Sequence, residues 1–153
     1  MNIIYPCFER EDAYGGAVLE CLQPHITTSG TPERARSEMH AVLLDMLAQS
    51  LVNRTPFPLP DRSLFADGSR VSIAFSMVET MKVFLINAMI ETDTTVPRLA
   101  QRLGISEIAA ERLVDPTAKP FAEKLGLPFL APNLEPYVRA ISATGKRVKL
   151  TLE

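Results

Sequence analysis

Two cysteines and two histidines are the side chains of this sequence best suited to hold a transition metal. They are Cys7, Cys21, His25 and His40. Structural zinc sites use closely spaced pairs such as Cys-x-x-Cys and His-x-x-x-His, and the chain has neither. We therefore expect no metal site and no cofactor, and two thiols that act as small buried hydrophobic groups. His40 falls in an amphipathic segment without an evident nucleophile, so we do not expect it to act as a general base.

A second possible function is suggested by the stretch from Leu99 to Leu113, which has the pattern of a DNA-binding helix-turn-helix. Ala100 is small enough for two helices to cross closely, and Gly104 supplies the positive φ that the turn needs. The predicted shared core consists of Leu99, Leu103, Ile105, Ala110 and Leu113. The second helix of such a unit can lie in the major groove of DNA.

The candidate DNA-binding residues follow from that geometry. On the second helix, the side chains expected to face bases or phosphates are Ser106, Glu107, Ile108, Ala109 and Arg112. At the start of the first helix, Thr95 and Arg98 would contact backbone phosphates. The alternative is an ordinary pair of packed helices, because Glu107 and Glu111 put negative charge on the presumed reading helix. From the motif alone, both interpretations remain open.

The elements before residue 76 predict a sheet covered by one helix. They are strands over 2–9, 14–22 and 25–28, a helix over 32–52 and a strand over 69–75. The helix start is marked by Thr31 as N-cap and Pro32 at the first helical position. Pro6 has no N–H for a ladder, which predicts an edge position or a bulge in the first strand. Residues 11–13 are predicted to form a turn.

The elements after residue 76 are mostly helical. They are helices over 76–91, 95–103 and 107–114, a helical turn over 121–125, a helix over 134–143 and a strand over 146–152. Ser76 and Glu79 have the spacing of a capping box, and Asn133 is the expected cap of the last helix. The chain is thus predicted to be an α+β protein with two modules, 1–75 and 76–153.

Charge and hydropathy limit the classes of partner. The net charge is −2, with six Lys/Arg against nine Asp/Glu in residues 1–75 and ten against nine in residues 76–153. The acidic first half is not suited to bind nucleic acid, and the second half is only slightly basic. The sequence has neither an apolar run long enough to cross a membrane nor the pattern of a signal peptide, so a cytoplasmic protein is expected.

Several short segments, in order, resemble the HicB-type antitoxins of bacterial toxin-antitoxin systems. They are Ile4-Tyr5-Pro6, Gly15-Gly16, Ser29-Gly30-Thr31-Pro32-Glu33, Pro58-Leu59-Pro60, the run from Met81 to Ala88, and the run from Thr144 to Leu150. The resemblance covers nearly the whole chain. It departs from the family at Val96-Pro97, in the alanine-rich, acidic reading helix, and in a longer proline-rich segment between Asp115 and Leu134.

The resemblance implies a degenerate RNase H-like first module that binds and blocks a small mRNA-cleaving HicA-type toxin. It also implies that the helix-turn-helix binds operator DNA and represses the shared operon, and that the protein forms homodimers or homotetramers. The acidic first half suits a basic, RNA-binding partner. Two alternatives remain: an adaptor whose helix-turn-helix no longer binds DNA, and a stand-alone transcription factor.

An RNase H-like module also raises the question of nuclease activity, which needs carboxylates that converge on metal ions. The candidates are Glu9, Glu11, Asp12 and Glu20. Glu11 and Asp12 fall in a predicted turn, and no later carboxylate has a convincing place at a strand end. We therefore expect that the protein is not an enzyme and has no catalytic residues.

Overall fold

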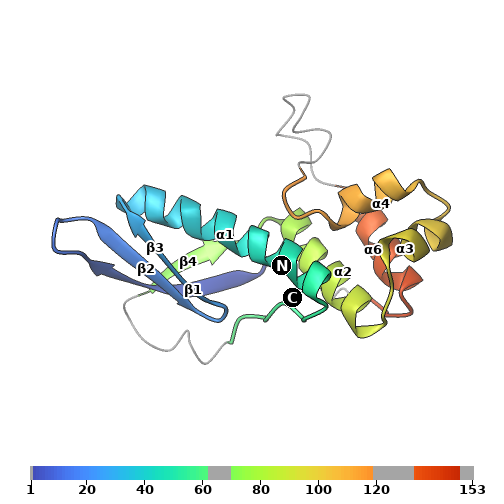
Figure 1. Ribbon diagram of the computed structural model, residues 1–153, viewed down its shortest axis with the longest axis horizontal. Coiled ribbons are helices and arrows are strands. Elements are labelled where there is room, and N and C mark those ends of the chain that lie inside the picture. The colour runs from blue at the N-terminus through green and yellow to red at the C-terminus, as the bar shows by residue number, and fades with distance from the viewer. Residues whose placement is uncertain (1, 62–69, 119–132, 149–153) are drawn as a thin grey trace.

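The N-terminal part of the chain forms one antiparallel sheet, as a computed structural model shows for residues 2–61, 70–118 and 133–148. Its strands are β1 (Ile4–Glu11), β2 (Ala17–Leu22), β3 (His25–Gly30) and β4 (Arg70–Ala74). They lie side by side in the order β3-β2-β1-β4, and every neighbouring pair is antiparallel. The helix α1 (Pro32–Asn53) lies across one face of this sheet (Figure 1).

Alternation along the strands explains why α1 covers that face. Side chains of successive residues point to opposite sides of a sheet, and here one side is apolar. The buried residues of this side are Tyr5, Cys7, Leu19, Cys21, Ile26 and Ile73. The α1 residues buried with them recur at helical spacing: Ala35, Met39, Leu43 and Leu47. The start of α1 is fixed by Thr31, whose hydroxyl accepts a hydrogen bond from the backbone N–H of Arg34.

The position of Pro6 differs from the prediction. β1 is not an edge strand, because β2 and β4 lie on its two sides. Its register with β2 runs from Cys7 to Glu11, whereas its register with β4 runs from Ile4 to Phe8. Pro6 therefore lies in the part of β1 that is paired with β4 alone. A proline is tolerated there because no second strand needs its missing N–H.

The second half of the chain is helical and continues the same apolar core. α2 (Met77–Glu91) lies between the sheet layer and a group formed by α3 (Val96–Leu103), α4 (Glu107–Val114) and α6 (Glu135–Ala143) (Figure 1). It contacts α1, α4 and α6. Its first turn has the predicted capping box, in which Ser76 and Glu79 exchange hydrogen bonds of 2.8 and 3.1 Å.

Hydrogen bonds fasten α2 to the first part of the chain. The backbone N–H of Ile3 donates to the Thr80 hydroxyl at 3.0 Å, in a buried position. The side-chain amide of Asn87 both accepts from the N–H of Phe57 at 2.8 Å and donates to the Phe57 carbonyl at 2.9 Å. Each bond satisfies a backbone group that would otherwise be buried without a partner. The chain therefore forms one connected core from Ile3 to Ile141.

The predicted α+β class is confirmed, whereas several element ends are wrong. Glu11 belongs to β1 and not to a turn, and the second strand begins at Ala17. The Asn133 side chain accepts from the N–H of Glu135, but the N-cap residue of α6 is Leu134, which makes no side-chain cap. Residues 146–148 lie outside any strand, and the predicted turn over 121–125 lies outside the described residues. None of the described helices is both long and apolar enough to span a bilayer.

Candidate nucleic-acid interface

The segment predicted as a helix-turn-helix forms two short helices, α3 and α4, joined by a turn. Thr95 is the N-cap of α3 and Ser106 is the N-cap of α4; each hydroxyl accepts from the backbone N–H three residues later, at 3.3 and 3.1 Å. Gly104 ends α3 with φ +66°, in the left-handed region. Its N–H donates to the carbonyls of Ala100 and Gln101, which closes the turn.

Small apolar residues hold the two helices together. Leu99 and Ala100 on α3 are buried, and so are Ala110 and Val114 on α4. Leu103 and Leu113 are only half-buried, whereas Ile105 is 37% exposed. The predicted shared core is therefore present at Leu99 and Ala110 and opens toward the turn.

The predicted DNA-binding side chains lie on the outer face of the unit. Ser106, Glu107, Ile108 and Arg112 are exposed on α4, and Ala109 is half-buried. Thr95 and Arg98 are exposed at the start of α3. The hydroxyls of Thr95 and Ser106 accept the capping hydrogen bonds, and each keeps its own O–H free to donate, for example to a phosphate. The structure thus brings all seven predicted residues to two adjacent helices.

A buried lysine that the motif did not predict sets the position of α4. Lys82 of α2 is 1% exposed, and its ammonium group donates to three backbone carbonyls. These belong to Arg112, Asp115 and Ala118, at 3.3, 2.5 and 3.2 Å. The three N–H donors of Lys82 are all used, and its positive charge lies at the negative end of the α4 dipole.

Burial and nearby carboxylates have opposite effects on the charged form of Lys82. Burial lowers the pKa of the Lys82 ammonium below its ordinary value, since a charged group loses hydration there. The carboxylates of Asp115 and Glu79 act in the opposite direction. The local sequence contains no signal for this residue, because lysine is almost never fully buried unless it is paired, and its partners lie on distant elements.

A second cation of the motif has a structural partner. The guanidinium of Arg102 donates to the carbonyl of Ala143 at 2.9 Å, which ties α3 to the end of α6. On the outer face this leaves Arg98 and Arg112 as cations, with Glu107 and Glu111 as the opposing carboxylates. The charges of the outer face therefore balance, and Arg102 leaves the two helices together at a net charge of only +1. Any attraction to phosphate thus depends mainly on where the arginines lie.

The nuclease candidates do not converge. Glu9 lies on the α1 side of the sheet and pairs with Arg36 at 3.3 Å, whereas Glu20 lies on the opposite side with His25, at 3.2 Å. Asp12 accepts from the backbone N–H groups of Tyr14 and Gly16, and so shapes the hairpin turn. Among the described residues, no cluster of three or more His, Cys, Asp and Glu side chains could hold a metal ion.

The two cysteines are directly opposite one another on β1 and β2. Cys7 and Cys21 form a register pair and are 0% and 1% exposed. The neighbouring Cys21 side chain, together with burial, raises the pKa of the Cys7 thiol, whereas the neighbouring Cys7 side chain lowers the pKa of Cys21. The Cys7 thiol donates to the backbone carbonyl of Tyr5 at 3.8 Å. Both histidines lie elsewhere, so the structure does not combine the four side chains considered as metal ligands.

His40 has a structural contact that joins two helices. Its Nε2 lies 3.0 Å from Oε2 of Glu79, the carboxylate that also closes the α2 capping box. The hydrogen bond to Glu79 raises the pKa of His40, against the effect of burial. Burial alone would raise the pKa of Glu79, but hydrogen bonds from His40 and from Ser76 lower it. The imidazole thus links α1 to the start of α2.

Comparison with known proteins does not assign the chain to a family or a function. No known protein family matches the chain, and no curated protein matches its sequence.

Proposed function

We propose that this protein is a HicB-type antitoxin that neutralises a small mRNA-cleaving toxin and represses its own operon through α3 and α4. The observation that carries the DNA-binding part is the helix-turn-helix, whose turn is closed by Gly104 and whose outer α4 face is open to solvent. The antitoxin part rests on the resemblance of the sequence, with which a sheet covered by one helix is compatible.

An exposed isoleucine supports a binding role for the outer face of α4. Ile108 is 72% exposed, although an isoleucine gains most free energy when it is buried. In the major groove, an aliphatic side chain contacts the methyl group of thymine, and an arginine one turn later on the same helix can reach a guanine or a phosphate. Ile108 and Arg112 have that spacing. Together they would provide one apolar and one charged contact.

The salt dependence of DNA binding can be estimated from the two arginines on the outer face. Arg98 and Arg112 would neutralise two phosphates per protomer, and a dimer would double this contribution. The slope of log K against log salt is about −0.9 per neutralised phosphate, so a dimer should show a slope of roughly −4. A family-type dimer would place its two reading helices on the two halves of a palindromic operator.

The first module is the proposed toxin-binding part. Its excess of carboxylates over cations complements a basic protein that binds RNA, and such charge complementarity speeds and orients association. We further propose that the protein acts in the bacterial cytoplasm as a homodimer or homotetramer, without enzymatic activity of its own.

Two measurements test this function. Co-expression with the neighbouring small reading frame should rescue growth from its toxicity, and the two proteins should co-purify. Fluorescence anisotropy with labelled upstream DNA should then show salt-dependent, sequence-selective binding. Arg112→Ala should weaken DNA binding and leave growth rescue intact, whereas Arg10→Ala, which removes the same charge from the exposed end of β1, should leave DNA binding unchanged.

The balanced charge of the outer face favours one rival, an adaptor that binds protein but not DNA. Glu107 and Glu111 repel phosphate on the helix that would read the groove. This rival predicts toxin neutralisation with no selective DNA binding by the antitoxin or by its toxin complex. If no neighbouring frame is toxic and nothing co-purifies, yet upstream DNA is bound selectively, the protein is a stand-alone transcription factor.

A further inference from the structure

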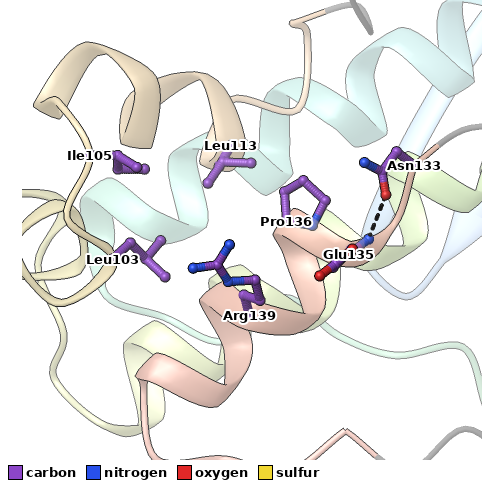
Figure 2. A pocket seen from close by; sticks show the side chains of 7 residues that line it. All are labelled: Leu103, Ile105, Leu113, Asn133, Glu135, Pro136 and Arg139. Carbon is purple, nitrogen blue, oxygen red and sulfur yellow. Dashed lines mark hydrogen bonds between the residues drawn. The ribbon is translucent and has the colours of Figure 1, made fainter.

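A pocket lies between the helix-turn-helix and α6, on the side away from the outer face of α4. It has a volume of about 330 Å³ (Figure 2). Its lining residues come from three helices and two connections: Leu103, Ile105, Leu113, Asn133, Glu135, Pro136 and Arg139. The volume falls near the lower end of the range of small-molecule sites, about 300–1,000 Å³.

The two sides of the pocket differ in chemistry. Leu103, Ile105 and Leu113 form an aliphatic wall that belongs to α3, the turn and α4. The opposite wall belongs to α6, and Figure 2 shows the guanidinium of Arg139 directed toward the space between Leu103 and Leu113. An apolar wall that faces a single cation is complementary to an amphipathic anion.

Arg139 is available for such a ligand. It is exposed, and within the described ranges its guanidinium has neither a hydrogen-bond nor an ion-pair partner. The planar guanidinium binds a carboxylate through two parallel hydrogen bonds, which fixes orientation as well as charge. The Arg102 guanidinium, by contrast, is already bonded to the carbonyl of Ala143.

The carboxylate of Glu135 limits which anions this pocket can bind. Its carboxylate is exposed on the same wall, one helical turn before Arg139. A phosphate or a dicarboxylate would bring a second negative charge close to Glu135, whereas a monocarboxylate is neutralised by Arg139 alone. The side-chain oxygen of Asn133 is already used, since it accepts from the N–H of Glu135 at 3.1 Å.

We propose that this pocket binds a small monocarboxylate with a short aliphatic tail. Arg139 pairs with the carboxylate, and the tail packs against Leu103, Ile105 and Leu113. The bound molecule contacts both helices of the helix-turn-helix and α6 together, so it stabilises their arrangement. This inference is independent of DNA binding, because it concerns a different face of the same helices.

Titration of the full-length protein with hexanoate tests the proposal. Isothermal calorimetry should give saturable binding with a dissociation constant on the order of 1 mM, as suits a ligand of this size. Acetate, which lacks the tail, and hexylamine, which has the opposite charge, should bind at least tenfold more weakly. Methyl NMR should place the largest shifts at Leu103, Ile105 and Leu113.

Substitutions separate the two walls of the site. Arg139→Gln should weaken hexanoate binding roughly tenfold or more, because a charge-assisted pair is lost. Arg10→Gln, at an exposed position of β1, is the matched control and should not change it. Ile105→Ser should weaken hexanoate binding and leave the weak binding of acetate unchanged.

Four outcomes overturn the proposal. In the unmodified protein they are no saturable binding of hexanoate, equal binding of hexanoate and hexylamine, and methyl shifts that cluster away from the pocket. The fourth is hexanoate binding that Arg139→Gln leaves unchanged. Because the NMR result needs no variant, it decides the matter even if a substituted protein fails to fold.

Discussion

Lys82→Met removes the buried ammonium that holds the end of α4 and keeps a side chain of similar length. Three carbonyls lose a charged donor, and hydrogen bonds to charged groups contribute about 1.5–3 kcal/mol each. Two effects reduce this sum: the cost of burying the ammonium disappears, and water can reach the carbonyls at the exposed Asp115 and the half-buried Ala118. We therefore expect a net loss of about 2–4 kcal/mol in the free energy of unfolding.

Urea unfolding followed by circular dichroism measures this loss, and thermal unfolding should show a Tm lower by roughly 5–15 °C. Hydrogen exchange should show the largest loss of protection in α4. The matched control is Lys146→Met, because Lys146 pairs at 2.5 Å with Glu91 between exposed side chains. Such a pair contributes about 0–1 kcal/mol. If both variants lose the same small amount, Lys82 does not position α4 and the reasoning is wrong.

Three further predictions concern the turn, the helix junction and the reading helix. Gly104→Ala should lower the free energy of unfolding in urea by about 1–2 kcal/mol, because φ is +66°. No atom lies within 4 Å of an added Cβ, so the loss would come from backbone strain alone, and an unchanged stability would contradict that strain. The contribution of His40 to the free energy of unfolding is complete below its ordinary pKa of 6.5 and is lost as pH rises through its raised pKa. The contribution of Glu79 is complete above its ordinary pKa of 4.5 and is lost as pH falls through its lowered pKa. His40→Gln should thus destabilise the protein more at pH 5.5 than at pH 8.5, and an equal loss at both would exclude a charged pair. Arg112→Ala should reduce both the affinity for DNA and the magnitude of the slope of log K against log salt, and an unchanged or steeper slope would argue against a phosphate contact.

Features that depend on a few neighbouring residues could be predicted from the sequence. The capping box at Ser76 and Glu79, the caps at Thr95 and Ser106 and the turn at Gly104 are all present. Each depends on hydrogen bonds within one helical turn, for which residue type and spacing are sufficient. The outer face of α4 could be predicted for the same reason, since helical periodicity alone separates exposed from buried positions.

Features that depend on the three-dimensional arrangement could not be predicted. Pro6 predicted an edge position or a bulge, because the sequence does not reveal that β1 is a central strand whose pairing with β2 begins only at Cys7. The bonds of Lys82 to Arg112 and Asp115 join residues more than one helix apart. The pocket beside Arg139 likewise exists only because α6 packs beside α3 and α4. Pairings of this kind are set by packing between elements and leave little trace in local spacing.

The hydrogen bonds that fasten α2 to the strands have a consequence for the order of events during protein synthesis. Residues 1–75 are synthesised before α2 and leave the ribosome ahead of it, so at that stage the N–H of Ile3 and both backbone groups of Phe57 still lack Thr80 and Asn87. We expect the sheet to unfold and refold readily until α2 has left the ribosome as far as Glu91. A nascent chain whose part outside the ribosome ends between residues 75 and 91 should therefore be digested readily by protease, whereas one whose outside part extends well beyond α4 should resist digestion.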